Sequence, residues 1–278
     1  MQTLGKKAKC YRVGKVEQMT STKELLKKYD ITPNKALGQN FLSNQAAINK
    51  IIEEACIDGK NVLEIGPGLG ALTRELVLRA KAVTAVEIDA KMVKVLSDIE
   101  GLNLIHQDFL KTDVSEVFGG ENFIVAANLP YYVTTPICMK LLDDSDRIES
   151  MTLMLQKEAA QRFFAPVGSK KYGPMTILAN RSYNITRVLE LSPSDYFPMP
   201  DVDSWVIHLE KKQGVQSMPQ FSKLLDRAFL MRRKTLVNNL MSGGILRSEA
   251  EELVQSAGLP LSVRAEAVTI EQFEKLVR

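Results

Sequence analysis

The sequence has few of the side chains that build metal centres and covalent cross-links. Its 278 residues include two histidines, His106 and His208, and three cysteines, Cys10, Cys56 and Cys138. An odd number of widely spaced cysteines fits neither a disulfide framework nor a zinc site. Two histidines are too few for a histidine-based metal cluster. We therefore expect no bound metal.

Long apolar runs are also missing. No stretch approaches the ~20 consecutive apolar residues that cross a bilayer, and the N-terminus has no apolar signal core. We therefore expect a cytoplasmic protein without a membrane partner. Hydrophobic residues still make up 45% of the chain, which is enough for one large domain and one small one.

The net charge of +3 is unevenly distributed along the chain. Residues 1–35 carry nine basic and three acidic side chains, residues 36–204 carry 16 and 22, and residues 205–278 carry 11 and eight. Basic ends thus flank an acidic middle, which suits a polyanion held by the ends and presented to a central site. Simple solvation of basic tails is the alternative, and it stays open for about the first 20 residues.

The most informative stretch is a short apolar run followed by three glycines. Residues 61–65 (Asn-Val-Leu-Glu-Ile) are typical of a buried parallel strand, and Gly66, Gly68 and Gly70 lead into a helix-forming run. A second apolar run ends in Glu87, where a carboxylate can accept hydrogen bonds from ribose hydroxyls. Together these features predict a nucleotide-binding βα unit rather than an ordinary turn.

The glycine spacing distinguishes between cofactors. A dinucleotide fingerprint reads G-x-G-x-x-G, whereas this turn reads Gly66-Pro67-Gly68-Leu69-Gly70. A pyrophosphate needs free backbone N–H groups at the turn, and Pro67 has none. A nucleoside without phosphates is therefore favoured, which indicates S-adenosylmethionine over NAD.

Strands and helices alternate from residue 61 onward. Predicted strands cover residues 61–65, 82–86, 103–106, 122–127 and 150–155, and predicted helices cover 71–79, 90–98, 135–142 and 157–165. This alternation predicts an α/β fold with a doubly wound, mostly parallel, Rossmann-like sheet. Two more strands, 183–191 and 203–209, are expected to form its antiparallel end. Four polar or glycine positions fall at successive strand ends, so we expect one pocket there: Gly66, Glu87, Asp108 and Asn128.

Other segments complete the predicted organisation. Residues 1–21 are expected to be a flexible basic extension, 22–212 one large domain that contains the predicted pocket, and 213–278 a small all-helical domain. Within the large domain, residues 22–29 predict a basic helix capped by Ser21 or Thr22. Residues 35–42 suggest a lid, but by themselves they are interpreted as the staple of a helix that Ser43 or Asn44 caps.

The loop after the fourth strand has the residue types needed to methylate an adenine amine. That nitrogen is a poor nucleophile because its lone pair is delocalised into the ring. The Asn128 side-chain carbonyl and the Pro130 backbone carbonyl can each accept one N–H, and Tyr131 can stack on the base. The base must leave its stack, and Phe197 is the candidate for a second aromatic face. Positioning then supplies most of the catalysis without an ionisable base.

With these residues in place, the chain resembles the ribosomal RNA adenine dimethylase family, and within it the bacterial small-subunit branch. The resemblance covers about residues 22–278. Its motifs are Gly38-Gln39-Asn40-Phe41-Leu42, Glu64-Ile65-Gly66-Pro67-Gly68, Asn128-Leu129-Pro130-Tyr131, Leu155-Gln156-Lys157-Glu158, Phe197-Pro198-Met199-Pro200, Arg232-Arg233-Lys234-Thr235-Leu236 and Arg264-Ala265-Glu266. Each motif is modest alone, but together and in this order they are highly specific.

The resemblance implies a reaction, a substrate and a set of site residues. The reaction is N6,N6-dimethylation of two adjacent adenosines in the 3′-terminal hairpin of 16S rRNA, within a pre-30S particle. Residues 22–212 are then the S-adenosylmethionine-binding catalytic domain and residues 213–278 the RNA-binding domain. Nothing in the sequence demands a dimer, so we expect a monomer. The implied contacts with S-adenosylmethionine are Asn40, Leu42, Gly66, Glu87, Asp108 and Asn128. The implied catalytic set is Asn128, Leu129, Pro130, Tyr131 and Phe197, and the implied RNA contacts are Lys157, Arg232, Arg233 and Lys234.

Three alternatives remain. The macrolide-resistance branch shares the fold and methylates large-subunit rRNA, but the Arg232-to-Leu236 run favours the small-subunit branch. DNA adenine methyltransferases usually have proline where Leu129 stands, and they need a target-recognition domain. An assembly factor whose binding outweighs its catalysis is the third. One departure also matters: Asp201 stands where the family usually has lysine, which weakens one expected phosphate contact.

Overall fold

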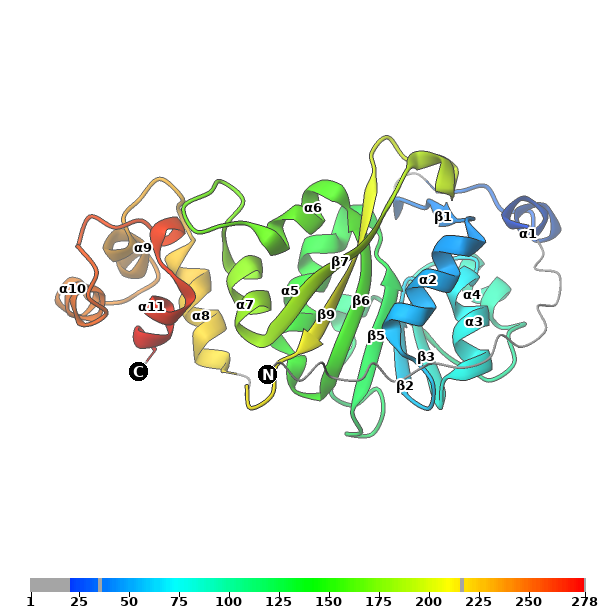
Figure 1. Cartoon of the computed structure of the whole chain (residues 1–278), viewed down its shortest axis with the longest axis horizontal. Helices are drawn as coiled ribbons and strands as arrows, with labels where there is room; N and C mark the ends of the chain where they lie inside the picture. Colours follow the sequence, from blue (N-terminus) through cyan, green and yellow to red (C-terminus); the bar gives the residue numbers. More distant parts are fainter. Residues whose placement is uncertain (1–20, 35–36, 216–217, 278) are drawn as a thin grey trace, which may run out of the picture.

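The computed structural model describes residues 21–34, 37–215 and 218–277. The predicted N-terminal extension therefore lies outside the described residues, except for Ser21. Figure 1 shows an elongated molecule with a central sheet, helix α1 (Thr22–Lys28) at one end and the C-terminal helices at the other. The Ser21 side chain caps α1 in a capping box with Glu24, so the first of the two predicted caps is the one used.

A seven-stranded sheet forms the centre of the fold, in the order β4-β3-β2-β5-β6-β9-β7. Its strands are β2 (Asn61–Ile65), β3 (Ala82–Glu87), β4 (Leu102–His106), β5 (Phe123–Asn128), β6 (Ile148–Gln156), β7 (Tyr183–Leu191) and β9 (Ser204–Lys211). The first five in sequence pair in parallel, and β9 pairs antiparallel with both β6 and β7. The doubly wound sheet with an antiparallel end is confirmed. The chain reverses direction across the sheet between β2 and β5, which is where such folds bind ligands.

Helices cover both faces of the sheet. They are α2 (Gln45–Ala55), α3 (Ala71–Arg79), α4 (Ala90–Leu96), α5 (Thr134–Asp143), α6 (Lys157–Gln161) and α7 (Pro174–Ser182). In β2, Val62 packs into the apolar cluster of α2 and α3, while Leu63 packs into the cluster of α5 and α7 on the other face. Both side chains are fully buried. This explains why β2 is a continuous apolar run rather than an alternating one.

Helix α7 and a second small sheet were not predicted. The signal for α7 was Pro174 at its first turn, a position where a missing N–H costs little. The small sheet joins β1 (Phe41–Leu42) to β8 (Tyr196–Phe197), with Phe41 opposite Phe197. Two-residue strands give no periodicity to detect. This sheet fastens the loop before α2 to the hairpin before β9.

The C-terminal region is all-helical, as predicted. It contains α8 (Pro219–Ala228), α9 (Leu236–Ser242), α10 (Arg247–Ser256) and α11 (Ile270–Lys275). Its core is not separate, because Leu225 of α8 belongs to the same buried cluster as Leu141 of α5 and Met175 of α7. The boundary at residue 213 stays a prediction about domains.

A leucine pair tests the shared core. Leu225 is fully buried and Leu246 is 74% exposed. We expect Leu225→Ala to lower the free energy of unfolding by about 2–5 kcal/mol, because it leaves a cavity. Leu246→Ala should change it by less than about 0.5 kcal/mol. Amide hydrogen exchange should show faster opening of both α5 and α9 in Leu225→Ala. A change confined to the C-terminal helices would mean that the two parts unfold independently.

Candidate functional site

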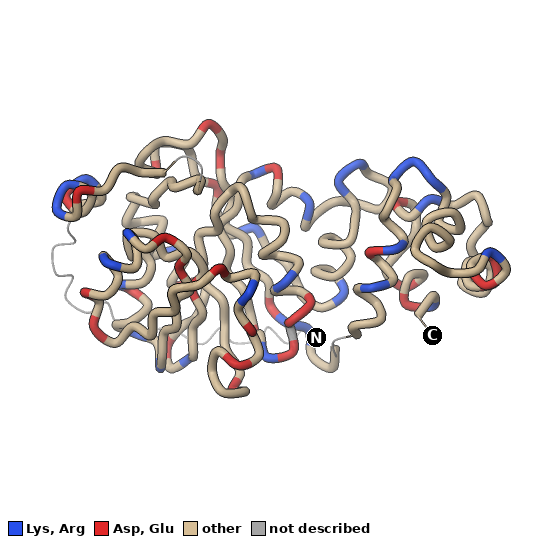
Figure 2. The backbone as a smooth tube through the Cα atoms, turned by 180° about the vertical axis from the view of Figure 1, so that it is seen from behind, with Lys and Arg blue, Asp and Glu red and all other residues tan. Residues whose placement is uncertain are grey.

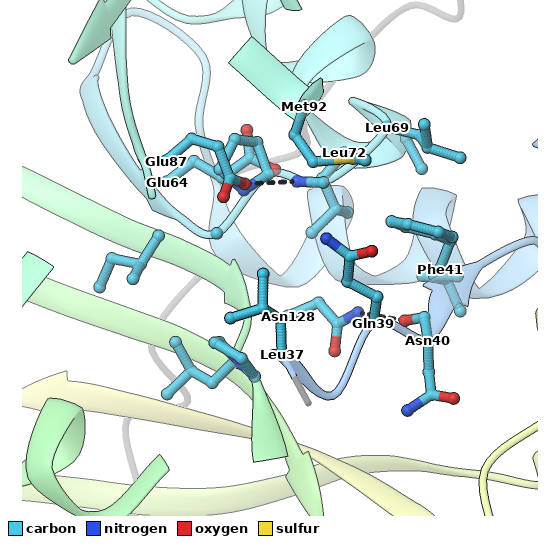
Figure 3. A pocket seen from close by; sticks show the side chains of 18 of the residues that line it. Leu37, Gln39, Asn40, Phe41, Glu64, Leu69, Leu72, Glu87, Met92 and Asn128 are labelled. Atoms are coloured by element: carbon cyan, nitrogen blue, oxygen red, sulfur yellow. Dashed lines mark hydrogen bonds between the residues drawn. The ribbon is translucent and has the colours of Figure 1, made fainter. Parts of the chain in front are cut away.

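One large cavity, of about 640 Å³, lies at the carboxyl ends of the parallel strands. Gly66, Glu87, Asp108 and Asn128, from the ends of β2 to β5, all line it. The expectation that four strand ends share one pocket is therefore confirmed. Figure 3 shows Glu64 and Glu87 together at one side of the cavity, with Asn128, Gln39 and Asn40 on the other.

The glycine turn lets an aromatic ring approach the backbone. Gly68 has a φ of +58°, which L-residues with side chains rarely adopt, and a Cβ there would lie 3.0 Å from Cδ1 of Phe41. Any larger residue would push away both the ring and β1. The turn therefore needs glycine both for its backbone conformation and for the contact with Phe41.

Glu87 holds this turn through its carboxylate, which is 6% exposed. Its Oε2 accepts the Gly68 N–H at 3.2 Å, and its Oε1 accepts the N–H groups of Ile88 and Asp89, both at 2.9 Å. Burial raises the pKa of Glu87, and the three N–H groups partly oppose that rise. A carboxylate offers about four acceptor positions, so one remains for a ligand hydroxyl.

Glu64 is a second acid in the cavity wall, to which the sequence assigned no role beyond its motif. It is 2% exposed, and its Oε2 has no hydrogen-bond partner in the described part of the chain. Burial raises the pKa of Glu64 to about 8; the Thr73 hydroxyl lowers it by less, and the charge of Glu87 raises it further. The side chain is therefore largely neutral at pH 7. The sequence signal for this buried acid was a glutamate in the middle of an otherwise apolar strand.

The loop before α2 closes one side of the cavity. Asn40 and Leu42 line it, as the resemblance implied. Gln39, to which no role had been assigned, donates from Nε2 to Oδ2 of Asp89 at 2.7 Å and so ties the loop to the start of α4. On the other side, the Asn40 carbonyl accepts from Nδ2 of Asn128 at 3.4 Å. Described from residue 37 onward, this loop forms a wall of the cavity, and its function as a lid stays a prediction.

The Asn128 loop presents two free acceptors, but one differs from the prediction. Because Nδ2 of Asn128 donates to Asn40, its Oδ1 is left to accept. The Pro130 carbonyl already accepts from the Thr134 hydroxyl at 2.9 Å and from the Val133 N–H at 3.3 Å. Both of its lone pairs are thus occupied, and the expectation for Pro130 fails. The Leu129 carbonyl accepts no hydrogen bond from the described residues, and Leu129 lines the cavity, so it is the better candidate for the second acceptor.

The two candidate stacking residues lie in different places. Tyr131 lines the cavity, and its hydroxyl lies 2.8 Å from Oγ of Ser204, at the start of β9. Burial raises the pKa of Tyr131, so the phenol stays neutral. Phe197 is not among the residues that line the cavity. It lies in β8 opposite Phe41, which does line it, and we call this position the rim. The ammonium of Lys23 is 5.2 Å from the ring centroid of Phe197. No direct ring contact joins Tyr131 and Phe197 in the described part of the chain, and a base held between them stays a prediction.

The predicted RNA-facing cations also differ from one another. Nζ of Lys157 lies 2.6 Å from Glu190 and 3.4 Å from Asp203, so its charge is already paired, and Glu190 raises the pKa of Lys157. Arg232, Arg233 and Lys234 are exposed in the turn between α8 and α9. A guanidinium nitrogen of Arg232 donates to the Lys170 carbonyl, and Figure 2 shows basic segments on neighbouring loops of this half. These contacts to RNA stay predictions.

Neither a metal cluster nor a membrane span is found in the described ranges. No group of three or more His, Cys, Asp or Glu side chains there is arranged to hold a metal ion. Among the described helices, none is long and apolar enough to cross a bilayer.

Known sequences that are similar to this chain carry names of ribosomal RNA methyltransferases. The family model for ribosomal RNA adenine dimethylase matches residues 31–278. A Clostridium botulinum protein named ribosomal RNA small subunit methyltransferase A is 40% identical over 266 residues, which cover 92% of this chain and 97% of the relative. A Bacillus pumilus protein of the same name is 41% identical, with 92% and 94% covered.

Solved structures add two similar folds. A dimethyladenosine transferase from Plasmodium falciparum aligns with a TM-score of 0.69 and 26% identity, covering 85% of this chain and 95% of its own. The 23S rRNA methyltransferase ErmE aligns with a TM-score of 0.59 and 26% identity, covering 86% and 98%. Since one of the two is named as a 23S rRNA methyltransferase, overall shape does not separate the rRNA branches. The similar sequences do, because both are named as small-subunit methyltransferases.

The buried Glu64 predicts how stability depends on pH. A raised folded-state pKa means that the folded chain keeps a proton that the unfolded chain releases above about its ordinary value of 4.5. Stability should therefore fall as pH rises from 4.5 to about 8, and then level off. Glu64→Gln stays neutral throughout and should be more stable than the parent at pH 9, by on the order of a few kcal/mol. Near pH 5 the two should match. The free energy of unfolding of both proteins is measured by urea titration at each pH. If the difference between the parent and Glu64→Gln does not change from pH 5 to pH 9, the raised pKa of Glu64 is contradicted.

Proposed function

The chain belongs to the ribosomal RNA adenine dimethylase family, and from this premise we propose that it dimethylates N6 of two adjacent adenosines in the 3′-terminal hairpin of small-subunit rRNA. The names of the curated relatives, about 40% identical over almost their whole length, support the small-subunit branch. We further propose a precursor small subunit as the substrate, a monomeric enzyme, and a cytoplasmic site of action.

The cavity suits S-adenosylmethionine as the methyl donor. Its volume of about 640 Å³ lies within the range of small-molecule sites. The open acceptor position of Glu87 fits a ribose hydroxyl, and Asp108, at the next strand end, fits the amine of the cofactor's adenine. Pro67 removes one N–H from the turn, which disfavours a pyrophosphate and leaves a nucleoside as the better ligand.

The observation that carries the proposal is the pair of free carbonyl oxygens beside this site. The cofactor supplies a methyl group activated by a sulfonium. Oδ1 of Asn128 and the Leu129 carbonyl can accept the two N–H groups of the target amine, which aims the nitrogen lone pair at that methyl. Loss of the proton needs no side-chain base, because it follows attack by a neutral amine. Tyr131, fixed by Ser204, offers its ring for the base to stack on.

Mapping the methylated nucleotide tests this function. The full chain is incubated with labelled S-adenosylmethionine and either undermodified small subunits or large subunits. Label on two adjacent adenosines near the 3′ end of 16S rRNA is the expected result. Label on large-subunit rRNA, or macrolide resistance in a sensitive host, would assign the chain to the other branch. Binding of precursor subunits without label would leave only an assembly role.

Asn128 provides the sharpest single substitution. Asn128→Ala removes one acceptor of the target amine, and we expect methyl transfer to fall by about a hundredfold or more, as for other positioned acceptors and donors. Affinity for S-adenosylmethionine, measured by calorimetry, should change by only a few fold, because most contacts with the cofactor remain. Asn128→Asp keeps an acceptor oxygen and should retain more activity than the alanine variant. Turnover equal to that of the parent in Asn128→Ala would refute the amine-holding role.

Glu87 tests the cofactor site separately. Glu87→Gln can still accept from Ile88 and Asp89, but it loses the charge and the acceptor for Gly68. Charge-assisted hydrogen bonds contribute ~1.5–3 kcal/mol, so the dissociation constant of the cofactor should rise by roughly 10–100-fold. Glu100→Gln, an exposed change of the same type, is the control and should leave affinity unaltered. Equal affinities in calorimetry would remove Glu87 from the cofactor site.

A further inference from the structure

Helix α1 forms part of the rim of the cavity. Leu25 and Leu26, on its buried side, are 8% and 7% exposed and pack into one cluster with Phe41 and with Leu69 of the glycine turn. Ser21, Thr22 and Leu25 line the cavity itself. Apolar contacts therefore anchor the helix at the cavity. Its lysines lie on the opposite, solvent-exposed face.

The three lysines of α1 differ in their surroundings. Lys28 donates to the Tyr29 hydroxyl at 2.9 Å and lies 3.5 Å from Asp98, so its charge is paired. Lys23 and Lys27 have no ion pair with any described carboxylate. Lys23 differs from Lys27 in its position, because its Nζ lies 5.2 Å from the ring centroid of Phe197 at the cavity rim.

The hairpin that carries Phe197 lacks positive charge of its own. Residues 190–203 contain four acidic side chains (Glu190, Asp195, Asp201 and Asp203) and no lysine or arginine. Glu87 and Asp108 add further acidic groups within the cavity. A strand of RNA that places a base here must therefore keep its phosphates out of the cavity and find a cation at the rim.

We infer that Lys23 binds the RNA backbone phosphate next to the adenosine that enters the cavity. This inference rests on the proposed function. The phosphate of a base that stacks on Tyr131 stays outside the cavity, because the acidic groups there repel it. The ammonium of Lys23 lies beside the Phe197 ring, on the helix whose first turn lines the cavity. Leu25 and Leu26 fix that helix. α1 is then an RNA contact as well as a wall of the pocket.

The test compares Lys23→Met with Lys27→Met, which remove the same charge from the same helix. At saturating cofactor, Lys23→Met should raise KM for the small subunit by about two- to fivefold, with little change in kcat. It should also make the slope of log affinity against log salt shallower by about one. Lys27→Met should show less than half of each effect. Lys23→Arg keeps the charge and should behave like the parent, and cofactor affinity should be the same in all four proteins.

Other outcomes would overturn the inference. A higher kcat in Lys23→Met with an unchanged salt slope would mean that Lys23 only holds α1 against Phe197. Equal effects of Lys23→Met and Lys27→Met would mean general attraction without a defined contact. The salt slopes are also measured by filter binding in the Asn128→Ala background, where methyl transfer is not needed. Failure of the parent to methylate small subunits would refute the proposed function instead, and is seen before any lysine variant is compared.

Discussion

The geometry of the site depends on the buried carboxylate of Glu87, which accepts hydrogen bonds from three backbone N–H groups. Removing the Glu87 carboxylate from water is unfavourable, and the bonds from Gly68, Ile88 and Asp89 offset that cost. These bonds join the turn after β2 to the junction of β3 and α4. Because Gly68 has no side chain, Phe41 can lie against the turn, and Phe41 pairs with Phe197 across the small sheet. A few short-range contacts thus connect the glycine turn after β2, the loop before α2 and the hairpin that carries Phe197.

A second connection runs through Asn128. Its Nδ2 donates to the Asn40 carbonyl, so its Oδ1 is left as an acceptor in a residue that lines the cavity. Nearby, the Thr134 hydroxyl and the Val133 N–H hold the Pro130 carbonyl, which fixes the loop so that the Leu129 carbonyl remains available. One amide therefore joins the loop before α2 to the loop after β5. In the proposed reaction, this contact would hold the acceptor of the target amine in place.

The sequence predicted those features that follow from topology. Parallel strands end at one edge of a sheet, so the order of strands along the chain is enough to place Gly66, Glu87, Asp108 and Asn128 in one pocket. What the sequence could not predict depends on contacts between distant segments. The Phe41–Phe197 pairing, the pairing of Lys157 with Glu190, and the position of Phe197 at the rim all depend on how loops meet in space. The occupied Pro130 carbonyl depends on a local turn that no periodicity reveals.

The apolar cluster that runs from the sheet into α8 and α9 has a consequence for the geometry of the molecule. A helical region joined to the sheet by buried leucines does not swing on a tether, so the exposed turn at residues 232–234 keeps a fixed separation from the cavity. The spacing between this turn and the cavity is therefore set by side-chain packing in the core and not by the length of a linker, so a substitution in that packing can shift the two relative to each other.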